Sequence, residues 1–172
     1  MTSENINPGK IFIASINLRG KRAEKPPGSV SLNVTSAQRK NSQERVDFSP
    51  MQPNGYKGFL NFEAYWQSGK VWGGVPRKES VDWWKKQKEP KRRFPKGKGR
   101  HVLHAIFEGV EGVGGDEKLD YVCSRKLVYV PEYAVYISNT ESLHKWKNIV
   151  KSGQDVVIYD FDGVRKPDGD VD

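Results

Sequence analysis

The sequence predicts an α+β fold in a single domain, with one mixed sheet of five or six strands and three or four short helices. A length of 172 residues suits one domain that buries a core of its own. Aromatic residues make up 11% of the chain within a hydrophobic content of 35%, which favours a core rich in large rings. The domain is expected to span residues 1–164, and residues 165–172 are expected to form a disordered tail.

Two strands are expected near the N-terminus, separated by a polar loop. Residues 10–16 are mostly apolar and β-branched, which is typical of a strand covered on both faces. Residues 30–34 alternate between apolar and polar side chains, as a half-buried strand does.

Residues 61–72 carry a helical pattern with an acid, an amide and an amine on one face. At about 100° per residue, Glu63, Gln67 and Lys70 form one narrow polar stripe beside an aromatic stripe. The aromatic stripe can bury against a core, which would place the polar stripe at the rim of a buried surface. The alternative is an ordinary solvated helix face, since surface pairs at these spacings are common and contribute only about 0.2–0.5 kcal/mol.

The next elements are a helix and two strands. Glu79 or Ser80 is expected to begin a short helix that carries a tryptophan pair on its apolar side. Residues 101–108 read as a strand with apolar side chains on both faces. Residues 120–130 are expected to continue as a strand, or as two strands with a bend.

The C-terminal part is expected to hold two helices and a buried strand. Residues 131–137 fit a helix with proline in its first turn, and residues 140–151 fit a helix capped by Thr140. The strand at residues 156–159 delivers Asp160 and Asp162 to its C-terminal end, where ligands gather in open α/β sheets. These acids suit magnesium or a ribose hydroxyl, or else form a plain turn with two solvated carboxylates.

Residues 85–100, called the basic loop below, hold nine basic residues and one acid, and this excess of 9 − 1 = +8 equals the formal net charge of the whole chain. Its prolines and glycines favour an extended loop that can follow a row of phosphates in DNA or RNA. The alternative is a solubilising loop, and no motif for sequence-specific readout is present. The expected nucleic-acid contacts are Lys85, Lys86, Lys88, Lys91, Arg92, Arg93, Lys96, Lys98 and Arg100.

Several classes of protein are not expected. A single cysteine, Cys123, excludes an intramolecular disulfide and suits a reducing compartment or a virion interior. No apolar run approaches the roughly 18 residues of a membrane span, and no signal peptide is recognisable, so a cytoplasmic, non-secreted protein without a membrane partner is expected. His101 and His104 would point to opposite faces of a regular strand, so neither a metal site nor a cofactor is expected.

A resemblance to a known family rests on the order Phe48-Ser49, a loop, then Glu63-x-Tyr65-aromatic-Gln67-small-x-Lys70. This order resembles the signature of the NADAR (YbiA-like) family, whose members typically show Phe-Ser, a loop, then Glu-His-Tyr-aromatic-Gln-Ala-x-Lys. That family is associated with cleavage of N-glycosidic bonds, including those of phosphorylated riboflavin-pathway intermediates and of ADP-ribosylated guanine. Taken whole, the sequence also looks like uncharacterised proteins of large DNA viruses and phages.

The resemblance implies an N-glycosidase-like enzyme that acts on an ADP-ribosylated or phosphoribosylated base or nucleotide. Glu63, kept ionised beside Lys70, would stabilise the oxocarbenium-like transition state or activate water, and Gln67 would orient the substrate. The remaining expected contacts are Lys70 or Arg45 to phosphate, Phe48, Ser49 and Tyr65 to substrate, Trp66 to the base, and Asp160 with Asp162 to a ribose hydroxyl.

A rival hypothesis is a non-enzymatic nucleic-acid-binding or virion-associated protein that uses the basic loop and exposed tryptophans. Ala64 stands where the NADAR family usually has histidine, which favours this rival. The retained Glu63, Gln67 and Lys70 favour the enzyme. A third possibility is a protein that binds a nucleotide such as ADP-ribose without turnover.

Overall fold

A computed structural model describes residues 7–17, 25–35 and 42–160, and these residues form an α+β protein, as the sequence predicts. The chain divides into two compact units, which the sequence did not predict. Met1–Ser49 and Asn139–Asp172 belong to the first unit, and Pro50–Ser138 form the second. The five strands of the described residues accordingly form two sheets, of three and two strands, instead of the one mixed sheet expected.

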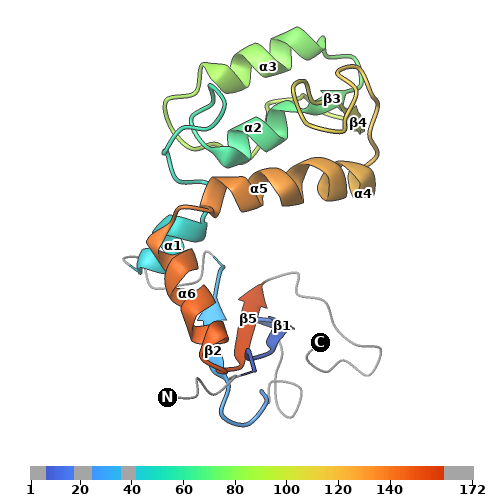
Figure 1. Cartoon of the computed structure of the whole chain (residues 1–172). Helices are drawn as coiled ribbons and strands as arrows, with labels where there is room; N and C mark the ends of the chain where they lie inside the picture. Colours follow the sequence, from blue (N-terminus) through green and yellow to red (C-terminus); the bar gives the residue numbers. More distant parts are fainter. Residues whose placement is uncertain (1–6, 18–24, 36–41, 161–172) are drawn as a thin grey trace. The chain divides into compact units, whose positions relative to one another are not determined.

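The first unit is built on a parallel sheet of β1 (Ile11–Ser15), β5 (Val156–Asp160) and β2 (Val30–Asn33), in that spatial order (Figure 1). All three strands lie where the sequence predicts them. The expectation that β1 is covered on both faces is wrong, because Ile11 and Ile13 are exposed on one face of this edge strand. Ala14 and Val157, both fully buried, pack together on one face of the sheet. The β-branched residues of β5 are favoured there because β5 is the central strand and pairs on both sides.

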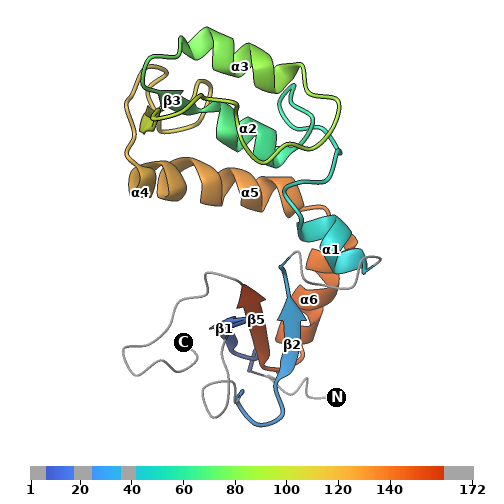
Figure 2. The ribbon, with the colours of Figure 1, turned by 180° about the vertical axis from the view of Figure 1, so that it is seen from behind.

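Helix α6 (Glu141–Lys151) confirms the helix predicted at residues 140–151. The Thr140 side chain accepts a hydrogen bond from the Leu143 N–H at 3.4 Å, which is the cap predicted from the sequence. Helix α1 (Gln43–Phe48), which the sequence did not predict, lies beside α6 within the same unit (Figures 1 and 2).

Acidic side chains of α1 join it to α6. The Asp47 carboxylate accepts a hydrogen bond from the Ser142 N–H at 2.9 Å, and Glu44 pairs with Lys145 at 2.8 Å. Burial would raise the pKa of Asp47, but hydrogen bonds from Ser142 and Gln43 outweigh it, and the pKa is lowered. An ionised carboxylate at the N-terminus of α6 satisfies free N–H groups and the helix dipole.

In the second unit, helix α2 (Phe62–Ser68) lies between helix α3 (Arg77–Lys85) and the stretch from α4 (Tyr121–Ser124) to α5 (Val130–Ile137) in both ribbon views (Figures 1 and 2). Its Phe62 packs against Tyr129, Tyr133 and Tyr136, while Ala64 packs in a cluster with Trp84. Helix α3 begins at Arg77 instead of at Glu79 or Ser80. The π-helical η2 (Arg125–Tyr129) joins α4 to α5.

The helix predicted over residues 61–72 ends at Ser68, and strand β3 (Lys70–Trp72) follows it. Strand β3 pairs antiparallel with β4 (Val102–Ala105). A Cβ atom on Gly69 would lie only 2.2 Å from the Phe107 ring, so the ring occupies the space that any other residue would fill. Glycine is therefore required at this junction, and Lys70 is placed by a strand instead of by the predicted helical stripe.

The strand predicted at residues 120–130 is wrong, because this segment begins a helical stretch that continues to Ile137. The Asp120 side chain caps it by accepting a hydrogen bond from the Cys123 N–H at 2.7 Å. Ser124 and Val128, one turn apart, are buried. The β-branched residues of the segment favour a strand locally, but burial of its aromatic face against α2 decides the conformation. The wider π-helical turn also relieves the clash that Pro131 would cause in a regular helix.

Candidate functional site

Helix α2 holds the candidate carboxylate at a well-capped start. The Asn61 side-chain oxygen accepts a hydrogen bond from the Ala64 N–H at 2.8 Å, and its amide donates to the Met51 carbonyl at 3.0 Å. Asn61 is fully buried, so the cap fixes the first turn of α2 within the core. Glu63 lies in that first turn, where the free N–H groups and the helix dipole favour a negative charge.

Gln67 lies one helical turn after Glu63 and binds it directly. The Gln67 Nε2 donates to the Glu63 Oε1 at 2.6 Å, and both side chains are half-buried. The hydrogen bond fixes the orientation of the carboxylate at the edge of the core. Gln67 therefore positions Glu63, a role that differs from the substrate contact predicted for it.

Lys70 is a half-buried cation at the start of β3. Burial lowers the pKa of its ammonium group, the nearby Glu63 carboxylate raises it, and the charge of Arg125 lowers it again. The net effect is a lowered pKa, because burial disfavours the charged form. The structure thus brings Lys70 within the electrostatic influence of Glu63, although the two residues lie on different elements.

Arg125 is a further candidate that the sequence interpretation missed. Its guanidinium carbon lies 3.9 Å from the centre of the Tyr129 ring and 5.9 Å from that of Trp66. These are cation–π distances, which hold the guanidinium against the aromatic surface beside Lys70. Arg125, Tyr129 and Tyr133 follow one another at four-residue intervals, which places them on one face of a helix. This spacing was not recognised, because residues 120–130 were predicted to form a strand.

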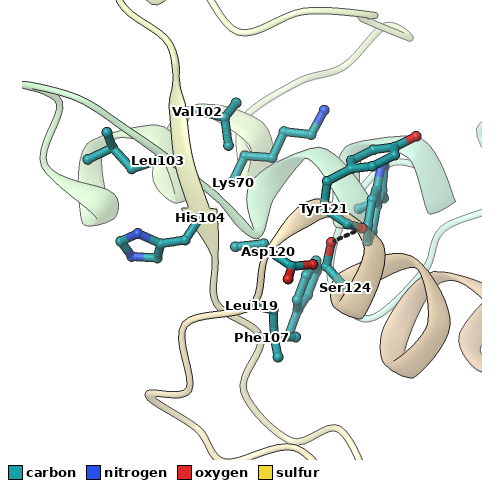
Figure 3. A pocket seen from close by; sticks show the side chains of 11 residues that line it. Lys70, Val102, Leu103, His104, Phe107, Leu119, Asp120, Tyr121 and Ser124 are labelled. Carbon is teal, nitrogen blue, oxygen red and sulfur yellow. Dashed lines mark hydrogen bonds between the residues drawn. The ribbon is translucent and has the colours of Figure 1, made fainter.

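A cavity of about 320 Å³, called the Lys70 pocket, opens beside these groups. Figure 3 shows Lys70 and Tyr121 extending on one side of β4, whereas the His104 imidazole points to the other side. The polar and aromatic residues that line the pocket are Trp66, Lys70, His104, Phe107, Asp120, Tyr121 and Ser124. Glu63 does not line it and influences it through Lys70.

Asp120 brings a carboxylate to this pocket. The hydrogen bond from the Cys123 N–H lowers the pKa of Asp120, which keeps the carboxylate ionised. The pocket therefore holds one half-buried cation and one acceptor for hydroxyl groups, as a sugar would need. Asp120 was not predicted as a site residue, because a strand position gave no reason to expect a helix cap there.

The predicted aromatic contacts lie at two different places. Trp66 lines the Lys70 pocket, but its ring is only 5% exposed and stacks on Phe107 with ring centres 5.5 Å apart. A base could therefore meet the edge of this indole and not its full face. Tyr65 does not line the Lys70 pocket and instead lines a second cavity, described below.

The other predicted contacts belong to the first unit, so the structure divides the candidate residues between two units. Arg45 and Phe48 lie in α1, with Phe48 buried, and Ser49 follows as the C-terminal cap. Asp160 is the exposed last residue of β5. Asp162 and the predicted tail lie outside the described residues.

The basic loop has no regular secondary structure over most of its length, as its prolines and glycines predict, and Phe94 anchors it to the core. It contains no helix or strand after Lys85, and Phe94 is only 7% exposed. The Phe94 ring packs on Trp72 and on Trp83, with ring centres 6.4 and 5.4 Å apart. Of the tryptophan pair, Trp84 is 1% exposed and belongs to the core, and the half-buried Trp83 makes the contact with the loop. The exposed tryptophans that the rival hypothesis would use are therefore not found in this pair. All the predicted contact residues of the loop are exposed except Lys96, which is half-buried.

Metal sites and membrane-spanning helices were also sought in the described part of the chain. Among these residues, no group of three or more His, Cys, Asp or Glu side chains is placed to hold a metal ion. No described helix is both long enough and apolar enough to cross a membrane.

Comparisons of the chain with protein-family models, with curated proteins and with solved structures found no match.

Proposed function

We propose that the protein cleaves an N-glycosidic bond of an ADP-ribosylated or phosphoribosylated base or nucleotide at the Lys70 pocket. The observation that carries the proposal is the hydrogen bond of 2.6 Å by which Gln67 fixes the Glu63 carboxylate, beside a half-buried lysine that lines a pocket of about 320 Å³. The resemblance of this segment to the NADAR signature supports the same chemistry.

The proposed reaction uses negative charge to stabilise a cationic sugar. The C–N bond breaks with its electron pair going to the base, and positive charge develops at the anomeric carbon. In this proposal the substrate occupies the Lys70 pocket, and its anomeric carbon lies outside the lining of the pocket, beside Glu63. There Glu63 stabilises the positive charge or accepts a proton from the attacking water. Water adds its oxygen to the anomeric carbon, and its proton ends on the released base.

The other residues of the pocket have supporting roles in this proposal. Lys70 binds a phosphate of the substrate, and its lowered pKa makes that contact dependent on pH. Asp120 accepts a hydrogen bond from a ribose hydroxyl. Arg125 does not line the pocket, but it is held on Tyr129 near Lys70 and adds a second positive charge for the phosphates.

The test is release of free base, measured by mass spectrometry. The full chain and its Glu63→Gln variant are incubated with ADP-ribosylated guanosine and with a phosphoribosylated pyrimidine. Glu63→Gln removes the charge and keeps the size, and we expect it to slow release by about 10²–10³-fold, as loss of one stabilising group at a transition state does. Glu79→Gln, at an exposed position on α3, is the matched control and should keep the wild-type rate.

A second function is favoured by the fixed geometry of the basic loop. We propose that the loop binds a nucleic-acid backbone, because Phe94 anchors it to the core while most of its cations remain exposed. With five or six phosphate contacts, the logarithm of affinity should fall with the logarithm of salt concentration at a slope of roughly −5. A double variant, Arg92→Gln with Arg93→Gln, should reduce this slope by about 2, whereas Lys147→Gln, at an exposed residue of the first unit, should leave it unchanged.

The two proposals separate in one pair of measurements. DNA binding that survives Glu63→Gln, without base release by the wild type, would support the loop and reject the glycosidase. Base release without salt-dependent DNA binding would support the glycosidase and reject nucleic-acid binding by the loop.

A further inference from the structure

A second cavity of about 200 Å³, called the Arg77 pocket, lies in the second unit and shares Phe107 with the Lys70 pocket. Three cationic side chains line it, one from the turn before α2 and two from α3. Aromatic rings form much of the remaining wall. The residues used below are Lys57, Phe59, Tyr65, Arg77, Lys85 and Glu108.

Lys57 reaches this pocket through an unusual backbone conformation. It has a φ of 46°, the only non-glycine residue among those described with positive φ, and Gly58 follows at 81°. Tyr56 and Phe59 exchange two backbone hydrogen bonds of 2.9 Å around these residues, so Lys57 and Gly58 are the centre of a tight hairpin turn. A lysine in the left-handed region costs free energy, and such strain concentrates at functional sites.

Each of the three cations is held against the wall of the pocket. Lys57 pairs with Glu132 at 2.7 Å, and its Nζ lies 5.3 Å from the centre of the Tyr65 ring. The Lys85 Nζ lies 5.8 Å from the centre of the Phe59 ring. Because these contacts fix the ammonium groups in advance, a ligand would not have to order them.

Arg77 is held by two acceptors and retains a further donor. Its Nη1 donates to Glu108 at 2.9 Å, and its Nη2 donates to the Ile106 carbonyl at 3.2 Å. Its Nε is buried and has no hydrogen-bond partner among the described residues. A buried donor without an acceptor costs about 1–3 kcal/mol, so an anion at this position would recover that free energy.

The Tyr65 hydroxyl also lacks a hydrogen-bond partner within the described part of the chain. Tyr65 is 6% exposed, and the hydroxyl itself is buried. Burial raises the pKa of Tyr65, and the charge of Glu132 raises it further, so the hydroxyl stays protonated and can donate. Arg77 and Tyr65 thus offer two buried donors in one small pocket.

Charge and size restrict the ligand. Three cations and the two carboxylates of Glu108 and Glu132 leave one positive charge, 3 − 2 = +1, which favours an anion. A volume of about 200 Å³ is smaller than the roughly 300–1,000 Å³ of pockets for drug-sized ligands. It suits a tetrahedral oxyanion with a small attached group and is too small for a segment of duplex.

We propose that the Arg77 pocket is a binding site for a terminal phosphate group, a phosphate monoester, with Arg77, Lys57, Lys85 and the Tyr65 hydroxyl as its donors. This site goes beyond the proposed cleavage, which needs only the Lys70 pocket. Arg77 and Lys57 lie outside both the Lys70 pocket and the basic loop, so the site can fail or hold independently of either proposed function.

The test is titration of the full chain with inorganic phosphate and with ribose 5-phosphate, followed by NMR chemical shifts. Ribose and a dinucleotide that carries only a phosphodiester serve as comparison ligands. Arg77→Gln removes the guanidinium, and Lys57→Asn removes the ammonium while keeping a residue that tolerates positive φ. We expect each variant to weaken binding of both phosphates by about tenfold or more, as loss of a charged hydrogen bond does.

Lys78→Gln is the matched control, since Lys78 lies on the same helix with its side chain 87% exposed and outside the pocket. It should change phosphate affinity by less than about twofold. Circular dichroism of each variant shows whether it folds. If Arg77→Gln does not fold, Lys57→Asn still tests the proposal. The proposal is overturned if neither phosphate shifts the signals of the residues that line the Arg77 pocket in the folded wild type, if the phosphodiester shifts those same signals equally, or if Lys78→Gln weakens phosphate binding equally.

Discussion

The Lys70 pocket and the Arg77 pocket share the Phe107 ring but differ in how their cationic side chains are held. Lys70 is half-buried and lies under the influence of the Glu63 charge, and burial lowers its pKa. Arg77 is held by two hydrogen bonds that it donates, to Glu108 and to the Ile106 carbonyl. A cation destabilised by burial suits a reacting site, whereas a cation held by hydrogen bonds suits binding of an anion.

The largest loss of stability is expected at Gly69, because it lies against Phe107, a residue that lines both pockets. Gly69→Ala places a methyl group 2.2 Å from the Phe107 ring, which is 2% exposed and stacked on Trp66 and so has little room to move. We expect this variant to lower the free energy of unfolding by about 3 kcal/mol, measured by urea denaturation. Loss of ligand binding at both pockets should accompany it.

Gly73→Ala is the control for this prediction, because a Cβ atom there would meet Leu103 at an ordinary 3.7 Å. Its free energy of unfolding should lie within about 0.5 kcal/mol of the wild type. Equal effects of the two substitutions would mean that Phe107 does not form a rigid wall between Gly69 and the two pockets.

A smaller difference in stability is expected between substitutions of Arg77 and of Lys70. Arg77→Met removes the hydrogen bonds to Ile106 and Glu108 and should lower the free energy of unfolding by about 2 kcal/mol. Lys70→Met relieves a buried charge and should change stability by less than about 1 kcal/mol, in the stabilising direction. The comparison of the two pockets fails if Lys70→Met proves the more destabilising substitution in urea denaturation.

The smallest expected effect is a difference in pH dependence. The pKa of Lys70 is lower in the folded chain than in the unfolded chain, so the unfolded state binds more protons between the two values. Lys70 therefore contributes a stability term that rises with pH through this window, and Lys70→Met should remove that rise. Denaturation midpoints from neutral pH up to 10.5, the ordinary pKa of lysine, measure it, and an identical pH dependence in the variant would contradict the assignment.

The sequence was sufficient where an element is defined by its own residues. The strands β1 and β5 are apolar runs that pair in a parallel sheet, and Thr140 caps α6 through a local hydrogen bond. The proximity of Glu63 and Gln67 likewise follows from helix spacing. These features depend on neighbours within a few positions along the chain.

The sequence was insufficient where distant residues decide the structure. The segment that begins at Asp120 has strand-like composition, but packing of Tyr129 and Tyr133 on Phe62 makes it helical. Lys70 leaves the helical stripe because Phe107, far along the chain, requires Gly69 and the strand pairing that follows. Asp120 joins the Lys70 pocket, and Arg125 comes near Lys70, only as a result of these contacts.

The most direct test of the account is the ratio of initial rates of base release from ADP-ribosylated guanosine by the wild type and by Glu63→Gln. The account predicts release by the wild type, a rate lower by about 10²–10³-fold in Glu63→Gln, and an unchanged rate in Glu79→Gln. Equal rates in all three proteins, or no release by folded wild type, would contradict the assignment of Glu63 and the Lys70 pocket as a glycosidase site.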